Sequence, residues 1–217
     1  MLYLYRKRPA LIQDTMPDII ERYYRLQAPL YDLTRPLFLF ERNRAREVLD
    51  AQKGETILEV GCGTGYNITS LAKNVGNTGK VYGLDSSSSM LSIARAKAAR
   101  HEWNNIHLIE GDACSFKAPE RVDRILFSYS LSMMGNSDNV IEKALENLKP
   151  SGTLVIVDFF CPETGKASLL FRLWRRWLAF NHVTLSSAPL IYIRDKARST
   201  DVAVFRKGYN YILKATF

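Results

Sequence analysis

"ILEVGCGTGYNITSLA", residues 57–72, places three glycines within five positions, between an apolar run and a segment with helical spacing. Glycine lets a chain turn tightly, and it lets a ligand approach the backbone without meeting a Cβ atom. Because Gly61, Gly63 and Gly65 directly follow the apolar run, the stretch predicts a ligand-binding turn between a strand and a helix.

The sequence on both sides of this turn alternates between β-rich and helical runs. The predicted strands are residues 56–60, 80–85, 106–112, 124–130 and 153–160, and the predicted helices are residues 67–75, 88–101 and 138–149. Such alternation predicts an α/β fold with a mostly parallel sheet and helices on both faces. Two more strand-like runs within 201–217, separated by Lys207 and Gly208, predict a hairpin that adds antiparallel strands and brings the sheet to seven.

We expect a single domain over residues 1–217, because this length and 47% hydrophobic residues suffice for one core. Its expected parts are a helical cap at 1–52, a cofactor-binding core at 53–160, a substrate or membrane insertion at 161–200 and the closing hairpin at 201–217. The cap and the insertion are expected to cover the carboxyl edge of the sheet, where open α/β folds bind ligands.

The composition of the chain bears on its location, on the state of its cysteines and on its partners. No apolar run reaches the roughly 18 residues of a spanning helix, and the first basic cluster follows apolar residues, unlike a signal peptide, so a cytoplasmic location is expected. Cys62, Cys114 and Cys161 are few and widely separated, which predicts free thiols and no metal site. The net charge of +8 favours polyanionic partners without choosing among nucleic acid, anionic lipid and phosphate-bearing substrates.

Two phosphate-binding motifs fit the glycine turn poorly. A P-loop needs Gly-Lys-Ser/Thr at the start of the helix, whereas this loop continues with Gly65, Tyr66 and Asn67. A dinucleotide fingerprint needs glycine in place of Tyr66, whose ring would obstruct the close approach of a pyrophosphate, so that alternative is weakened but stays open.

Acidic residues near the turn favour a cationic nucleoside ligand. Asp85 ends the second predicted strand about 20 residues after the turn, where a carboxylate can accept hydrogen bonds from a ribose diol. Asp112 ends the third predicted strand, where it can accept a hydrogen bond from an adenine amine. Glu59 adds negative charge that suits an ammonium and a sulfonium and opposes a pyrophosphate.

Four stretches in order, "ILEVGCGTGYN", "VYGLDSSSSML", "IEGDA" and "ALENLKPSGTLVIVDF", resemble the successive motifs of class I S-adenosylmethionine-dependent methyltransferases over roughly residues 55–160. The resemblance implies a Rossmann-like methyltransferase fold, S-adenosyl-L-methionine as the cofactor and S-adenosyl-L-homocysteine as the product. It implies cofactor-binding roles for Glu59, Gly61, Cys62, Gly63, Thr64, Gly65, Asn67, Asp85, Ser86, Met90, Asp112, Ala113 and Ser128.

A second resemblance concerns the methyl acceptor. "YYRLQAPLYDLTRPLFLFERNR", "ILFSYSLSMM" and "RLWRRWLAFNHV" are similar to stretches of small bacterial phospholipid N-methyltransferases, which act on phosphatidylethanolamine or on betaine-lipid precursors. The resemblance implies methyl transfer to the amine of a lipid headgroup. The spacing of Tyr24, Ala28, Tyr31 and Asp32 is shared with quinone-type methyltransferases, so a small soluble or quinone-like acceptor is the alternative, and an RNA-binding module is an alternative of another class.

Methyl transfer needs alignment of the nucleophile, the methyl carbon and the leaving sulfur more than it needs proton chemistry. Tyr24, Tyr31 and Tyr129 are the candidate catalytic residues, because a hydroxyl can orient an amine and an aromatic ring can hold a methylated ammonium. Arg35 is a candidate partner for a lipid phosphate, and His182 is a candidate for taking the amine proton.

Residues 168–180 mix leucine, tryptophan and phenylalanine with three arginines. This mixture is typical of a helix that lies on an anionic membrane surface, and it predicts peripheral association with the inner face of the membrane. The alternative is that the apolar side chains fill the core while the arginines face water. Neither a nucleic-acid partner nor a metal is expected.

Overall fold

The computed structural model describes residues 38–100, 103–160, 169–180, 183–206 and 208–217. Its helices are α2 (Arg42–Leu49), α3 (Ile68–Val75), α4 (Ser88–Arg100), α5 (Ser137–Glu146), α6 (Leu169–Phe180) and α7 (Ala188–Lys196), with the short 3-10 helix η3 (Leu131–Met133). Its strands are β1 (Thr56–Val60), β2 (Lys80–Asp85), β3 (Ile106–Glu110), β4 (Val122–Ser128), β5 (Leu148–Phe159), β6 (Ser199–Phe205) and β7 (Asn210–Thr216).

The strands form one seven-stranded sheet in the order β3-β2-β1-β4-β5-β7-β6. Strands β1 to β5 pair in parallel, whereas β7 is antiparallel to both β5 and β6. The expected fold, a mostly parallel sheet with a closing hairpin, is therefore confirmed. The strand order reverses between β1 and β4, which is the place where open α/β sheets bind ligands, at the carboxyl ends of the strands.

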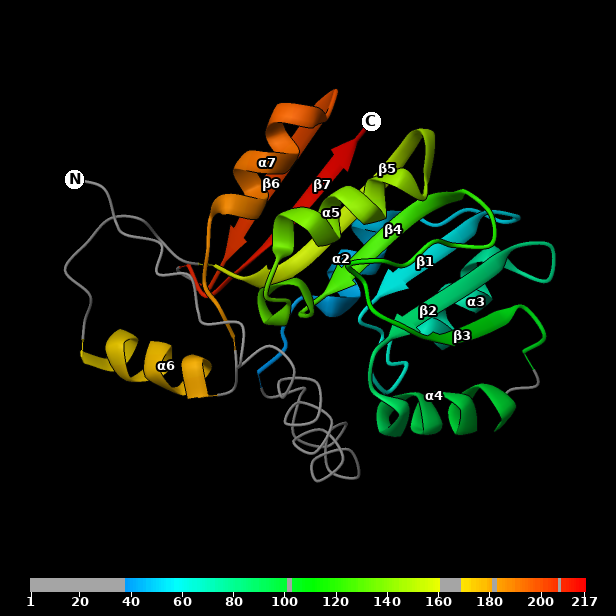
Figure 1. Ribbon diagram of the computed structural model, residues 1–217, viewed down its shortest axis with the longest axis horizontal. Coiled ribbons are helices and arrows are strands. Elements are labelled where there is room, and N and C mark those ends of the chain that lie inside the picture. The colour runs from blue at the N-terminus through cyan, green and yellow to red at the C-terminus, as the bar shows by residue number, and fades with distance from the viewer. Residues whose placement is uncertain (1–37, 101–102, 161–168, 181–182, 207) are drawn as a thin grey trace.

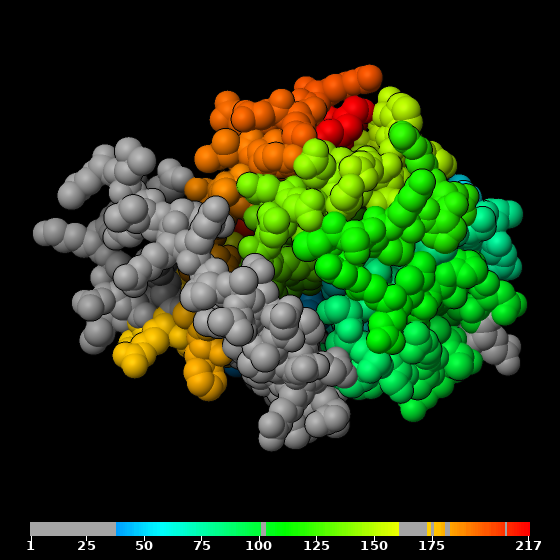
Figure 2. Space-filling model, viewed as in Figure 1, coloured from blue at the N-terminus to red at the C-terminus, as the bar shows by residue number. Residues whose placement is uncertain are grey.

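Helices cover both faces of the sheet because successive strand residues point to opposite sides. On one side, Leu58 and Phe127 pack in a core cluster with α5 and α7. On the other side, Ile57 and Leu126 pack in a second cluster with α2, α3 and α4. Figure 2 shows the first layer, in which the atoms of α5 and α7 lie against each other over the sheet. The whole of β1 is buried between the two layers, which explains its uninterrupted apolar character.

The structure corrects the predicted bounds of three strands, and β3 ends at Glu110, two residues before the predicted end. Strand β4 ends at Ser128 because Tyr129 adopts a φ of 55°, which no extended strand allows. Strand β5 begins at Leu148, five residues before the predicted start, because a shift in register lets Leu148 pair with Val122. A Cβ atom on Gly152 would lie 2.5 Å from Cγ of Leu148, so glycine is needed at this irregularity.

Helix α6 lies beyond the carboxyl ends of the strands (Figure 1), and it has two apolar sides. Trp174 packs with its ring centroid 5.0 Å from that of Tyr209, and Leu178 is buried. On the other side, Leu173 and Phe180 are 56% and 78% exposed. The side of α6 that carries Trp174 and Leu178 therefore packs into the core. For the side that carries Leu173 and Phe180, contact with a membrane surface stays a prediction. Among the residues that the structure describes, no helix is long and apolar enough to cross a bilayer.

Candidate functional site

One cavity lies at the carboxyl ends of β1, β2 and β4, where the strand order reverses. All of the predicted cofactor-binding residues line it except Gly65. The cavity is also lined by residues that the sequence did not assign to the cofactor: Arg42, Tyr66, Leu84, Gly111, Tyr129, Ser130, Met133 and Met134. The structure thus brings together residues from three of the four cofactor motifs and from the predicted strand 124–130, which are far apart in the sequence.

The glycine turn is held tightly against its neighbours. Gly61, Gly63 and Gly65 all have positive φ angles, of 73°, 54° and 75°. A Cβ atom on Gly61 would lie 2.4 Å from Cβ of Ser130, and one on Gly65 would lie 3.0 Å from Cβ of Ala94. Gly63 has open space where a Cβ atom would point. Packing therefore requires glycine at position 61 and disfavours a Cβ atom at position 65, whereas backbone conformation alone favours glycine at 63.

Asp85 connects the glycine turn to the start of α4. Its Oδ2 accepts a hydrogen bond from the backbone N–H of Gly63 at 2.7 Å, and its Oδ1 accepts one from the N–H of Ser87 at 2.9 Å. Each carboxylate oxygen can accept a second hydrogen bond, and the residue lines the cavity, so Asp85 can also receive a ribose diol. Asp112 lines the same cavity, and its Oδ1 accepts from the N–H of Cys114 at 2.9 Å.

Glu59 is a buried carboxylate in the cavity wall. Its Oε1 accepts a hydrogen bond from Nδ2 of Asn67 at 2.6 Å, while Oε2 has no partner among the described residues. Burial raises the pKa of Glu59 from 4.5 to about 7, against the opposing effects of the Asn67 hydrogen bond and of Arg42 and Arg46. A buried carboxylate with an unpaired oxygen is suited to a ligand that brings a positive charge.

The pKa of Glu59 gives a prediction for stability against pH. Folded Glu59 keeps its proton at pH values where the unfolded chain has lost it, so the free energy of unfolding should fall as pH rises from 4.5 to about 7. In urea unfolding of the ligand-free protein, Glu59 should contribute a loss of about 3 kcal/mol over this window, and Glu59→Gln should remove that contribution. Burial raises the pKa of Asp158 from 3.8 to about 6, so a smaller fall should remain in the variant. A pH profile unchanged by Glu59→Gln would contradict the prediction.

Tyr129 lines the cavity, but its hydroxyl is engaged elsewhere. The hydroxyl donates to the carbonyl of Phe40 at 2.7 Å and accepts from Nδ2 of Asn210 at 2.9 Å. Burial is the main reason that the pKa of Tyr129 is raised. The hydroxyl therefore joins the segment before α2 to β7, and the prediction that it orients an amine gains no support, whereas contact of its ring with a ligand stays a prediction.

The other predicted acceptor-side residues, Tyr24, Tyr31, Arg35 and His182, lie outside the described residues. In the described part of the chain, no group of three or more histidine, cysteine, aspartate or glutamate residues could hold a metal ion. Cys62 and Cys114 are free thiols, and burial raises the pKa of both.

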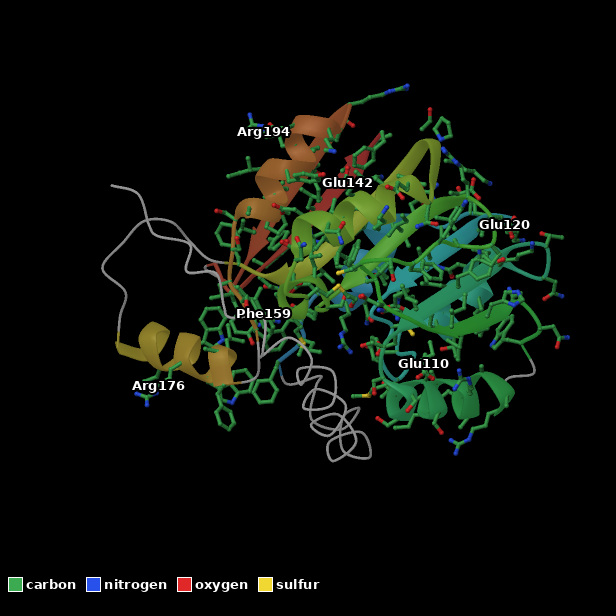
Figure 3. All side chains as sticks on the ribbon, viewed as in Figure 1. Glu110, Glu120, Glu142, Phe159, Arg176 and Arg194 are labelled. Atoms are coloured by element: carbon green, nitrogen blue, oxygen red, sulfur yellow. The ribbon has the colours of Figure 1, made fainter. Side chains whose placement is uncertain are left out.

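A second cavity adjoins the first, and Met134 lines both. Asp158, at the end of β5, lies in its wall with Phe159, Pro189 and Tyr211. Oδ1 of Asp158 accepts from the hydroxyl of Ser132 at 2.6 Å, and Oδ2 accepts from the N–H of Ser132 at 2.9 Å. In Figure 3, Phe159 lies between the strand ends and α6, whereas Arg176 lies on the side of α6 away from it. The second cavity thus combines aromatic and polar walls beside the first.

The family model and the curated relatives that this chain matches are all described as methyltransferases. A family model described as a methyltransferase domain matches residues 51–194. The demethylmenaquinone methyltransferase of Oceanobacillus iheyensis is 31% identical over 169 residues, which cover 75% of this chain and 67% of that protein. The demethylmenaquinone methyltransferase of Listeria monocytogenes is 26% identical over 171 residues, which cover 76% of this chain and 72% of that protein.

Among solved structures, an S-adenosylmethionine-dependent methyltransferase from Aquifex aeolicus superposes with a TM-score of 0.65. The two chains are 22% identical, and the superposition covers 92% of this chain and 97% of that one. At this identity the likeness shows a shared fold.

Proposed function

Because the chain belongs to the methyltransferase domain family and is an S-adenosylmethionine-dependent methyltransferase, we propose that it transfers the methyl group to a quinone-like acceptor. The observation that carries the proposal is the 31% identity to a demethylmenaquinone methyltransferase over 75% of this chain. The phospholipid amine expected from the sequence has weaker support, because the named relatives fit the quinone-like alternative.

The polar lining of the first cavity supports the assignment of the cofactor to it. Glu59, Ser128 and Arg42 each line it with a buried polar atom that has no hydrogen-bond partner among the described residues. Buried polar atoms are seldom left unpaired, so these three atoms are natural partners for a ligand. We assign the ribose to Asp85 and the adenine to Asp112 and Met90, as expected from the sequence. The cofactor supplies a methyl group made electrophilic by the sulfonium.

A quinone-like acceptor places a further demand on the site. Its reacting atom gains the methyl group and loses a proton, while the sulfonium becomes a neutral thioether, so a group near the acceptor has to receive that proton. We assign the acceptor to the second cavity, where the aromatic wall at Phe159 suits a flat ring. Asp158 lies in the same wall, and burial raises its pKa to about 6, within the range in which a carboxylate can take up a proton near neutral pH.

The proposal predicts which acceptor becomes labelled. Purified protein with S-adenosylmethionine carrying a labelled methyl group should label a short-chain demethylated naphthoquinol and leave phosphatidylethanolamine vesicles unlabelled. Asp85→Ala should abolish the labelling, because Asp85 lines the cofactor cavity and holds the glycine turn. Glu146→Ala is the matched control, since Glu146 is an exposed residue of α5 that lines neither cavity, and it should keep full activity.

Two outcomes would contradict the proposal. Labelling of phosphatidylethanolamine without labelling of the quinol would return the assignment to the phospholipid amine. Labelling of neither acceptor by a protein that still binds the cofactor would exclude both acceptors and leave the cofactor assignment intact.

A further inference from the structure

The first cavity contains one basic residue, Arg42, that lies outside the four cofactor motifs found in the sequence. We propose that Arg42, the first residue of α2, binds the carboxylate at the amino-acid end of the cofactor, and that Glu59 receives the ammonium beside it. The inference rests on the proposed function, because it takes S-adenosylmethionine as the ligand. Arg42 and Glu59 would together bind the zwitterionic end of that ligand.

Arg42 is held in place without using up its hydrogen-bonding capacity. Its guanidinium carbon lies 4.8 Å from the ring centroid of Tyr66 and 6.0 Å from that of Tyr129. Its Nε is buried and has no hydrogen-bond partner in the described part of the chain. A guanidinium held over an aromatic ring by cation–π attraction can still use its N–H groups to bind a carboxylate.

Charge in the cavity allows only one orientation of a zwitterion. Among the described residues that line the cavity, Arg42 is the only basic one, whereas Glu59, Asp85 and Asp112 are acidic. A ligand carboxylate would be repelled at either aspartate and attracted at Arg42. The amino-acid end therefore points to α2, and the adenosine end points to the carboxyl ends of β2 and β3.

Arg42 and Glu59 are close enough to interact without neutralising each other. The positive charge of Arg42 opposes the rise in the pKa of Glu59, yet no ion pair within 4.0 Å joins them among the described residues. Oε2 of Glu59 also has no partner there. A partly buried cation and a buried anion that each keep an unpaired buried atom, in side chains that line one cavity, are complementary to a ligand with both charges.

Arg46, one turn later on the same helix, provides a matched control. It also lies over Tyr66, at 5.6 Å from the ring centroid, but it does not line the cavity. Its guanidinium is instead occupied by Oδ1 of Asn43 at 2.8 Å and by Oδ1 of Asn67 at 3.3 Å. Replacing Arg46 removes a similar charge, a similar cation–π contact and the hydrogen bond to Asn67, without removing a group that lines the cavity.

The test compares two ligands that differ only at the amino-acid end. S-adenosylhomocysteine carries the ammonium and the carboxylate, whereas 5′-methylthioadenosine has neither, and calorimetry gives the affinity of each without any need for turnover. Arg42→Met should weaken S-adenosylhomocysteine binding by about 10- to 100-fold, as expected for a lost charged hydrogen bond, and should change methylthioadenosine binding by less than about threefold. Arg46→Met should leave both affinities within about threefold of the unmutated protein.

Each remaining outcome has a definite meaning. Equal losses for both ligands, or no loss for either, would overturn the role of Arg42. A folded, unmutated protein that does not bind S-adenosylhomocysteine would instead overturn the cofactor assignment on which the inference rests. Should Arg42→Met not fold, Arg42→Lys carries the same comparison, because it keeps the charge and loses the planar fork, and a selective loss of S-adenosylhomocysteine affinity is again expected.

Discussion

Gly61→Ala is expected to unfold the protein or to lower its free energy of unfolding by about 3 kcal/mol or more. The new Cβ atom would lie 2.4 Å from Cβ of Ser130, at a φ of 73° that alanine rarely adopts. Ser130 cannot easily move away, because its hydroxyl donates to the carbonyl of Val60 at 2.6 Å and the residue is buried. Urea unfolding followed by circular dichroism measures the change.

Gly76→Ala separates the effect of the close contact with Ser130 from the effect of the positive φ angle. Gly76 has a similar φ of 67°, but a Cβ atom there meets nothing within 4 Å. Since Gly76 also has a ψ of −174°, this variant should lose about 1 to 3 kcal/mol, the cost of the backbone conformation alone, and should stay more stable than Gly61→Ala. Equal stability of the two variants would show that Ser130 does not constrain the turn, and the packing argument for Gly61 would be wrong.

Asp85→Ala is expected to weaken S-adenosylhomocysteine binding by about 100-fold or more. The change removes the predicted ribose hydrogen bonds, and it also leaves the N–H groups of Gly63 and Ser87 without their acceptor. The glycine turn then loses the contact that fixes it beside the cavity. Both effects act on the same binding free energy, so the loss should exceed that of a single hydrogen bond.

Asp123→Ala is the matched control for this experiment. Asp123, in β4, also accepts a hydrogen bond from a backbone N–H, that of Thr56 at the amino end of β1, at 2.8 Å, but it lines neither cavity. Both variants should lose some thermal stability, whereas only Asp85→Ala should lose affinity in calorimetry. An Asp85→Ala protein that is folded and binds normally would remove Asp85 from the cofactor site.

The fold could be predicted because its core strands carry local signals. Residues 56–60 and 80–85 are short apolar runs bounded by polar or turn residues, and both became strands with the predicted bounds. The start of β5 was wrong because it depends on a non-local pairing. Pro150 and Gly152 look like the end of a connection in the sequence, yet Leu148 still pairs with Val122 across the register shift.

The cofactor side of the site could be predicted for the same reason, since its residues follow directly on strand ends. Arg42 could not, because it is one of three arginines in "RNRAR", and only the packing of α2 decides which of them reaches the cavity. Tyr129 was proposed as a catalytic residue from its residue type. The partners of its hydroxyl, Phe40 and Asn210, are distant in the sequence and could not be foreseen.

The position of β7 between β5 and β6 has a consequence for refolding. Strand β5 is almost fully buried from Gly152 to Phe159, and until the β6–β7 hairpin docks, this apolar strand presents an open edge of unpaired N–H and C=O groups. Such edges recruit strands from other molecules. Refolding from denaturant should therefore compete with aggregation, and dilution should favour the native state because hairpin docking is unimolecular whereas aggregation is not.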